Sequence, residues 1–220
     1  MKLYLDPIST TSRPLLMFAE EHALPVEIVH VRLFEGEHRT PDFLRINPNG
    51  CVPVLVDGGF VLTESGAILR YLADLAGSPA YPTDLRARAR INAAMDWFAT
   101  NFHTAVGTQL AYPALFPAFH PFSPEARAEV AATGLASAHR WLVVLDQHML
   151  GPRRNYVAGE ELTIADYVGG SMLALAEAAE VDLGDTPNVR RWLATLKGRP
   201  SWDPTFAAFN GLLSATRPAA

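Results

Sequence analysis

Two stretches of the sequence carry residues that could bind a ligand, and the first contains a Val-Pro pair. Val52-Pro53 stands directly before Val54-Leu55-Val56, a short apolar run that we expect to form a strand. Because proline cannot donate a hydrogen bond to a sheet, it usually lies at a strand start or an edge, where a tight bend can hold a cis peptide bond. Such a bend would leave the backbone N–H and C=O of Val52 free to pair with an extended peptide ligand.

The second stretch is Glu64-Ser65, at the start of an apolar run from Ala67 to Leu72 that looks helical. A helix start presents unpaired N–H groups, and this one adds a hydroxyl and a carboxylate in the same place. Such a terminus favours a bound carboxylate, and Glu64 could take an amino group. The alternative is a hairpin followed by an ordinary serine cap.

Both stretches belong to a region that we predict to be an α/β domain. Strand-like runs cover residues 2–5, 26–31, 54–56 and 60–62, and helical segments begin at Arg13-Pro14, near His38 and at Glu64. The loop from Ile8 to Ser12, between the first strand and the first helix, is unusually rich in hydroxyl groups. The order β-α-β-α-β-β-α predicts a four-stranded mixed sheet with helices on it.

The rest of the chain has no strand signal and is predicted to be all helical. Five apolar residues repeat at helical spacing over four turns: Ile91, Met95, Phe98, Phe102 and Ala105. We therefore divide the chain into a domain at residues 1–77, a linker at 78–85 and an all-helical domain at 86–220. The tail, residues 216–220, is expected to fray.

A specific helix start is predicted at Ile164. Thr163 and Asp166 fit a capping box, and Leu162 and Tyr167 fit the hydrophobic staple that accompanies it. We expect this motif to fix a buried helix, so Asp166 has a structural and not a catalytic role.

Composition excludes several classes of function. The formal net charge is −5 and no long run of Lys or Arg is present, which argues against nucleic-acid binding. No apolar run is long enough to span a membrane, and the first residues do not resemble a signal peptide. Cys51 is the only cysteine, and the seven histidines show no metal-ligand spacing. We expect a cytoplasmic protein with no bound metal and no internal disulfide.

Taken together, these features resemble the glutathione S-transferase superfamily. Three motifs carry the resemblance in the expected order, over nearly the whole chain: Asn47 to Leu55, Leu62 to Ile68 and Leu162 to Asp166. The opening from Leu3 to Arg13, with Gly36 to Arg39, is most similar to the theta-like branch that uses serine. The resemblance implies a thioredoxin-like domain that binds glutathione, a helical second domain, a homodimer and a role in detoxification.

Position by position, the resemblance implies roles for five residues of the first domain. Ser9 matches the catalytic serine. Val52 matches the residue whose backbone pairs with the cysteinyl part of glutathione, and Pro53 matches the cis-proline. Glu64 and Ser65 match the pair that holds the γ-glutamyl end.

The chemistry expected of Ser9 is hydrogen bonding to sulfur. A thiol has a reference pKa near ~8.5, so glutathione is mostly protonated at neutral pH. A hydroxyl that donates to the thiolate beside a helix N-terminus lowers this pKa, and the thiolate then attacks an electrophile directly. The alternatives are that Thr10 or Ser12 meets the sulfur, or that these hydroxyls only cap the following helix.

The match is less complete at the glycyl end of glutathione. His38 matches a histidine near that end, and Arg39 matches a basic neighbour. Cys51 stands where serine-type relatives carry a lysine that meets the glycyl carboxylate, so binding should weaken unless Arg39 or His38 compensates. Thr100 and His103 stand where relatives have an acidic and a basic residue that reach across the dimer.

The resemblance places the second substrate, an apolar electrophile, against the helical domain. The candidate contacts are Ile8, His103, Val106, Gly107, Leu110, Tyr112, Phe116, Phe119 and Phe122. We predict that the proline-rich segment from Pro113 to Pro124 forms a lid or rim over this site. The alternative is an ordinary connection between helices whose aromatic side chains fill core or dimer contacts.

The sequence therefore predicts a dimeric, theta-like glutathione transferase that conjugates glutathione to an apolar electrophile or displaces a halide from one. One alternative is a glutathione-dependent disulfide or peroxide reductase, helped by Thr10 or by Cys51, although Cys51 is more simply interpreted as a small residue in a loop than as a redox group. Another is a non-catalytic ligand-binding protein of the same fold. Family membership constrains the thiol half of the reaction and leaves the electrophile open.

Overall fold

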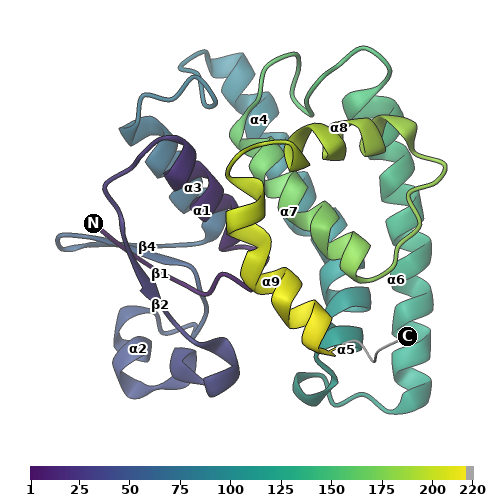
Figure 1. Ribbon diagram of the computed structural model, residues 1–220, viewed down its shortest axis with the longest axis horizontal. Helices are drawn as coiled ribbons and strands as arrows, with labels where there is room; N and C mark the ends of the chain where they lie inside the picture. The colour runs from purple at the N-terminus through teal and green to yellow at the C-terminus, as the bar shows by residue number, and fades with distance from the viewer. Residues whose placement is uncertain (217–220) are drawn as a thin grey trace. The chain divides into compact units, whose positions relative to one another are not determined.

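The computed structural model describes residues 1–216, which form two compact units (Figure 1). The first unit comprises residues 1–81 with the segment that begins at Pro200, and the second comprises residues 82–199. The predicted boundary at residue 86 places the last helix in the helical domain, whereas the contacts group it with the first unit. Fraying is predicted for residues 216–220, of which residue 216 is the last of a helix and residues 217–220 lie outside the described part of the chain.

The first unit is built on a four-stranded sheet. Its elements are β1 (Lys2–Leu5), α1 (Arg13–Glu21), β2 (Glu27–His30), η1 (Leu33–Glu35), η2 (Glu37–Arg39), α2 (Pro41–Ile46), β3 (Val54–Asp57), β4 (Phe60–Thr63), α3 (Ser65–Leu75) and α9 (Trp202–Thr216). The strand order is β2-β1-β3-β4, in which β1 and β2 are parallel and the other pairs are antiparallel. The predicted β-α-β-α-β-β-α order and the mixed sheet are therefore confirmed.

Side-chain alternation in the strands lets helices cover both faces of the sheet. In Figure 1, α1 and α3 lie on one side of the strands and α2 lies on the other. Leu3 and Leu5 of β1 are fully buried, while Tyr4 between them packs against the buried Phe43 of α2. A shift of one residue in the pairing of β1 would move Leu3 and Leu5 to the face covered by α2 and Tyr4 to the opposite face. The burial of these side chains on their own faces therefore fixes the register of the strand.

The second unit is helical, as predicted. Its elements are α4 (Leu85–Trp97), the π-helical segments η3 (Phe98–Phe102) and η4 (Thr104–Ala111), α5 (Tyr112–Leu115), η5 (Pro117–Phe119), α6 (Pro124–Val144), the π-helical segment η6 (Leu145–Leu150), α7 (Ile164–Ala178) and α8 (Pro187–Lys197). The five apolar residues spaced along residues 91–105 are all buried. Within residues 1–216, no helix is both long and apolar enough to cross a bilayer.

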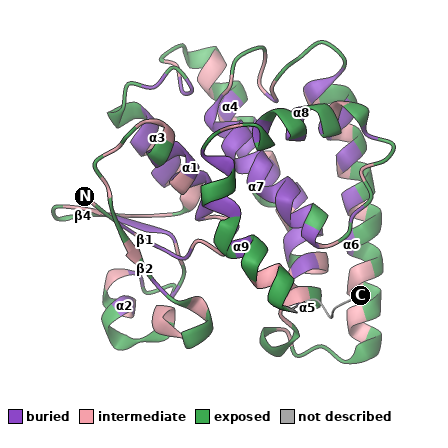
Figure 2. Ribbon diagram, in the orientation of Figure 1, coloured by how far each residue is buried: buried purple, intermediate pink, exposed green. Residues whose placement is uncertain are grey.

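Helix α7 lies in the core of the second unit and is buried along most of its length (Figure 2). The capping box predicted at its start is present. The side chain of Thr163 accepts a hydrogen bond from the backbone of Asp166, and the side chain of Asp166 accepts one from the N–H of Thr163. Gly169 lets two aromatic rings approach α7, since a Cβ at this position would lie 2.5 Å from Phe98 and 2.6 Å from Trp192.

Candidate functional site

The register of the sheet brings the predicted ligand-binding segments to one end of the first unit. Tyr4 of β1 lies opposite Val54 of β3, and Val54 lies opposite Thr63 of β4, with both pairs antiparallel. The residues after β1, before β3 and after β4 therefore leave the sheet at the same end. Since β2 is parallel to β1, with Leu5 opposite His30, the segment after β2 also starts there.

A buried carboxylate holds the loop that follows β1. Asp6 accepts hydrogen bonds from the backbone N–H groups of Ile8 at 3.1 Å and of Leu33 at 3.0 Å, and it lies 3.3 Å from the ring of His30. The N–H of Ser9 donates to the Asp6 carbonyl at 3.0 Å. These contacts join Asp6 to the segment that follows β2 and hold the backbone of Ser9 next to Asp6.

The buried guanidinium of Arg13 supports the same loop. It donates to the carbonyl of Ile8 at 2.7 Å and to the hydroxyl of Thr10 at 3.3 Å. Its carbon atom lies 5.0 Å from the ring centre of Phe206 and 4.1 Å from that of Phe209, both in α9. Cation–π contacts of this kind offset part of the hydration that a buried cation loses. The last helix of the chain thus supports the loop that follows the first strand.

Burial distinguishes the four hydroxyl groups of this loop. Thr10 is 3% exposed, and Ser12 is fully buried with no hydrogen-bond partner for its Oγ among residues 1–216. Ser9 and Thr11 are partly exposed, and their hydroxyl oxygens lie 3.1 Å apart. Thr11 also donates to the carbonyl of Val52 at 3.4 Å. Accessibility therefore favours Ser9 over Thr10 and Ser12 as a donor to a ligand.

The peptide bond between Val52 and Pro53 is cis, as the sequence suggests. In the described part of the chain, the N–H of Val52 makes no hydrogen bond, and its C=O accepts only the long contact from Thr11. Val52 therefore presents a donor and an acceptor to an extended chain, the arrangement that adds a peptide to a sheet edge.

The junction between β4 and α3 has an unusual backbone. Glu64 has a φ of +66°, in the left-handed region that residues other than glycine rarely adopt. It is the N-cap of α3, and its side chain makes no capping hydrogen bond. The first N–H groups of α3 are thus not satisfied by this carboxylate, and together with the helix dipole they favour a bound anion. Residues with such strained backbones concentrate at functional sites.

A cationic side chain lies against the loop that contains Cys51. A Cβ added to Gly50, whose φ is +59°, would lie 3.0 Å from Nη1 of Arg39. Burial lowers the pKa of His38, and the charge of Arg39 lowers it further, so the imidazole favours its neutral form. Arg39 therefore places a positive charge beside the loop that contains Cys51.

A buried asparagine shapes the loop before Val52. The side-chain amide of Asn47 donates to the carbonyl of Cys51 at 2.7 Å, and its carbonyl oxygen accepts from the N–H of Asn49 at 3.1 Å. The exposed thiol of Cys51 donates to the carbonyl of Asn49 at 3.4 Å.

Three residues that organise this end of the sheet are not singled out by the sequence: Asp6, Thr11 and Asn47. Asp6 reads as a strand breaker before proline, and Asn47 reads as turn chemistry. Their position in the sequence could have indicated this role. Each is a short polar side chain directly beside a predicted ligand-binding segment, where it can form hydrogen bonds with the backbone.

In the second unit, a His–Tyr pair is the centre of the predicted electrophile contacts. Nε2 of His103 lies 2.9 Å from the hydroxyl of Tyr112. Burial lowers the pKa of His103, which favours the neutral ring. A Cβ at Gly107 would lie 2.6 Å from the His103 ring, so glycine makes room for this pair. Val106 is buried in the core of the unit.

The remaining predicted contacts are less enclosed. Leu110 and Phe116 are half-buried, and Phe116 contacts the ring of Tyr112. Phe119 is 59% exposed. Ile8 belongs to the first unit, where it is half-buried.

The proline-rich segment from Pro113 to Pro124 forms short helical turns followed by irregular chain. His120 stacks on Tyr112 and on Phe122, which attaches the segment to α5. Phe119 and Phe122 are exposed, so in the described chain they do not fill a core. A lid or a contact with a second subunit therefore remains as their predicted role.

The two residues predicted to depart from the dimer contact are engaged within their own unit. The hydroxyl of Thr100 donates to the carbonyl of Asp96 at 2.8 Å, one helical turn earlier. His103 bonds to Tyr112 as described above.

The chain matches two family descriptions, which together cover most of it. Residues 8–75 match "Glutathione S-transferase, N-terminal domain", and residues 91–200 match "Glutathione S-transferase, C-terminal domain". The matched ranges contain every predicted glutathione contact and most of the helical unit.

Curated proteins and solved structures give the same result. The chain is 35% identical to human glutathione S-transferase theta-2B over 195 residues, which cover 87% of this chain and 78% of the relative. It is also 35% identical to mouse glutathione S-transferase theta-1 over 170 residues, or 76% and 70% of the two chains. The solved structure of human glutathione transferase theta-2, a complex with glutathione and an unknown ligand, matches with a TM-score of 0.84 and 30% identity over 98% of this chain and 89% of that one. On this sequence and structural agreement, the chain belongs to the glutathione S-transferase family and to its theta-like branch.

Proposed function

We propose that the end of the sheet described above binds glutathione and activates its thiol for attack on an apolar electrophile. The observation that carries the proposal is the partly exposed Ser9 hydroxyl, which is linked through Thr11 to the carbonyl of Val52. The N–H of the same Val52 makes no hydrogen bond within the described residues. The hydroxyl and the peptide-pairing edge thus lie close enough for one tripeptide to reach both.

The chemistry of the site fits the groups of glutathione. The tripeptide has an extended backbone, a free amine, a thiol and two carboxylates. Val52 supplies the backbone pairing, while the α3 start at Glu64 and Ser65 suits the carboxylate and amine of the γ-glutamyl end. Arg39, with His38, suits the glycyl carboxylate, because Arg39 lies against the loop at Gly50.

In the proposed mechanism, Ser9 donates a hydrogen bond to the sulfur and thereby favours its thiolate form. Ser9 remains a donor and forms no covalent bond. Sulfur bonds to the electrophilic carbon, while a leaving group such as halide departs or, in an addition, a proton is taken up from water. We propose that Tyr112 and the aromatic residues near it help to bind the electrophile, because apolar and aromatic side chains suit such a ligand.

The comparison of Ser9→Ala with Ser12→Ala tests this proposal. We expect Ser9→Ala to retain glutathione binding by calorimetry, to raise the pKa of the bound thiol, and to lower kcat/KM for a small apolar halide by about 100-fold. Ser12→Ala removes a buried hydroxyl that has no partner among the described residues, so it should leave both quantities unchanged.

Other results of these measurements would support a different thiol donor or a different function. An unchanged thiol pKa in Ser9→Ala would remove Ser9 as the donor. No binding of glutathione at millimolar concentration would leave a non-catalytic protein of this fold. Disulfide reductase activity that is lost in Cys51→Ser would favour a reductase, since the Cys51 thiol is exposed.

We also propose that the protein is a cytoplasmic homodimer, as its family resemblance implies. Light scattering of the purified chain measures its mass in solution. A monomer at micromolar concentration would exclude the dimer and, with it, a role for Phe119 and Phe122 as subunit contacts.

A further inference from the structure

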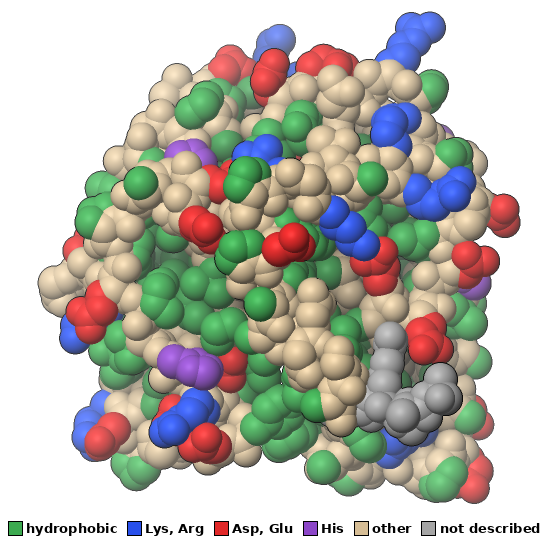
Figure 3. Space-filling model, in the orientation of Figure 1, with side chains coloured by type: hydrophobic (Ala, Val, Ile, Leu, Met, Phe, Trp, Pro, Cys, Tyr) green, Lys and Arg blue, Asp and Glu red, His purple; other side chains and the backbone are tan. Residues whose placement is uncertain are grey.

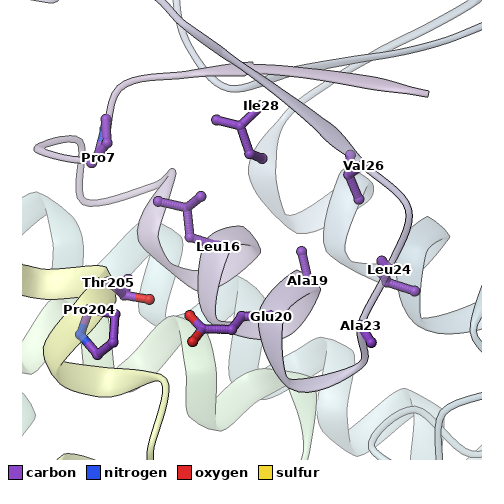
Figure 4. A pocket seen from close by; sticks show the side chains of 10 residues that line it. All are labelled: Pro7, Leu16, Ala19, Glu20, Ala23, Leu24, Val26, Ile28, Pro204 and Thr205. Atoms are coloured by element: carbon purple, nitrogen blue, oxygen red, sulfur yellow. The ribbon is translucent and has the colours of Figure 1, made fainter.

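The first unit contains a cavity of about 490 Å³ at the sheet edge formed by β2 (Figure 4). Leu16 and Ala19 of α1 contribute apolar walls, and so do Val26 and Ile28 at β2. Hydrophobic side chains gather on the molecular surface beside β2 and α1 (Figure 3). None of the residues that we propose to bind glutathione lines this cavity, so it is a separate place on the unit.

Two polar groups interrupt the apolar lining. Thr205 of α9 is 4% exposed, and its hydroxyl has no hydrogen-bond partner among residues 1–216. Glu20 of α1 is exposed, and within the same residues its carboxylate makes no hydrogen bond or ion pair. Figure 4 shows the two groups directed toward each other from α9 and α1.

This combination selects for a particular ligand chemistry. A buried hydroxyl without a partner carries a desolvation cost that a ligand N–H can relieve. A carboxylate attracts a cation through a charge-assisted hydrogen bond and repels an anion. Apolar walls favour a hydrocarbon body. One protonated amine could therefore donate to both Glu20 and Thr205 while its hydrocarbon part lies against Leu16 and Ile28.

We propose that this cavity, called here the α1–α9 cavity, binds small apolar amines in their protonated form. The proposal is independent of the glutathione reaction, because it rests on Glu20 and Thr205 and on neither Ser9 nor Val52. The site would let the protein hold a cationic aromatic or alkyl amine while its thiol chemistry proceeds elsewhere.

A matched set of probes tests the proposal on the full chain. We would titrate 2-phenylethylammonium, the neutral 2-phenylethanol and the anionic 3-phenylpropanoate, and follow backbone amide signals by NMR. The amine should bind about tenfold more tightly than the alcohol, and the acid should not bind. The shifted signals should include residues 24–28, beside β2.

Variants separate the two polar contacts. Glu20→Gln should weaken amine binding about tenfold and leave alcohol binding unchanged. Thr205→Val should weaken amine binding about fivefold, while the unfolding midpoint stays the same or rises because a buried hydroxyl without a partner is removed. Thr205→Ser should retain most of the binding. Ser9→Ala should bind the amine as the parent does.

Several results would overturn the proposal. Equal affinity for amine and alcohol, or an unchanged affinity in Glu20→Gln, would show that only apolar contact is involved. No binding at millimolar amine, in a protein whose glutathione activity shows that it is folded, would show that the cavity is filled by water. Loss of binding in Ser9→Ala, with shifts near Val52, would place the amine in the glutathione site instead.

Discussion

Thr11 links the proposed thiol donor to the peptide-pairing edge. In the structure it lies 3.1 Å from the Ser9 hydroxyl and donates to Val52 at 3.4 Å. Because a hydroxyl has one hydrogen, Ser9 must then donate to Thr11 and has none left for a sulfur. A peptide N–H that takes over the Val52 carbonyl would free the Thr11 hydrogen for Ser9, and the Ser9 hydrogen for the thiolate. Peptide binding and thiol activation would then be coupled.

Thr11→Val tests this coupling. The valine cannot donate to Ser9, so Ser9 becomes a weaker donor and the pKa of bound glutathione should rise, by less than in Ser9→Ala. A neutral hydrogen bond contributes about 1 kcal/mol, so we expect a fall in kcat of roughly fivefold at neutral pH. Absorbance of the thiolate against pH measures the pKa.

Thr11→Ser is the matched control, because it keeps the hydroxyl and should restore the parent pKa. If Thr11→Val and Thr11→Ser behave alike, the hydroxyl has no part in activation and only the shape of the loop matters.

At the scale of elements, the start of α7 depends on one buried carboxylate. Asp166 accepts hydrogen bonds from the N–H groups of Val157 at 2.9 Å and of Thr163 at 2.8 Å, and from the indole of Trp192 at 3.0 Å. It also accepts the Thr163 hydroxyl at 2.9 Å. One side chain thus joins the start of α7, the loop before it and α8. We expect Thr163→Ala to lower the free energy of unfolding by about 1 kcal/mol in urea.

The same carboxylate predicts a pH dependence of stability. Burial raises the pKa of Asp166 from 3.8 to about 6, while its hydrogen bonds to Val157, Thr163 and Trp192 lower it in part. Because the folded value is above the unfolded one, this group stabilises the fold most below pH 3.8, and the contribution is lost as the pH rises through 6. A shift of about two units corresponds to roughly 3 kcal/mol.

The carboxyl carbon signal of Asp166 should therefore titrate with a midpoint near 6. The unfolding free energy of the parent, relative to Asp166→Asn, should fall between pH 4 and pH 6 and stay level above that range. A midpoint below 4 would mean that the hydrogen bonds outweigh burial.

At the scale of the whole molecule, the chain returns to its first unit after the helical one. Helix α9 contacts α1 through Arg13, whose guanidinium lies against Phe206 and Phe209. The Ser201 hydroxyl also donates to Glu21 at the end of α1. The loop that carries Ser9 therefore depends on the last described helix.

Phe209→Ala should destabilise the first unit. Truncation of a buried phenylalanine costs about 3 kcal/mol or more, and here it also uncovers the Arg13 cation. Hydrogen exchange should accelerate in α1, and glutathione affinity should fall. Asn210→Ala changes the exposed neighbour and should do neither. If hydrogen exchange in Phe209→Ala were faster only within residues 82–199, α9 would belong to the helical domain, as the predicted domain at residues 86–220 implies.

Local signals in the sequence predict most of the elements and several site residues. The spacing of apolar residues, the Val-Pro pair before β3 and the capping box at Thr163 each act over a few neighbouring residues. For this reason the mixed sheet, the cis bond and the start of α7 could be predicted without knowledge of distant contacts.

The sequence alone determined that hydroxyls follow β1, that Val52-Pro53 precedes β3 and that Glu64-Ser65 opens α3. The tertiary structure decided which of these groups a ligand can reach. In the sequence, Thr10 and Ser12 are alternatives to Ser9 because they offer hydroxyls in the same loop. They differ from Ser9 because folding buries both of them, with Thr10 accepting a hydrogen bond from Arg13. The place of α9 was likewise decided by contacts between residues nearly 200 positions apart, such as Arg13 and Phe209. No local sequence pattern predicts such a contact, because closing so long a loop requires the packing of the whole unit.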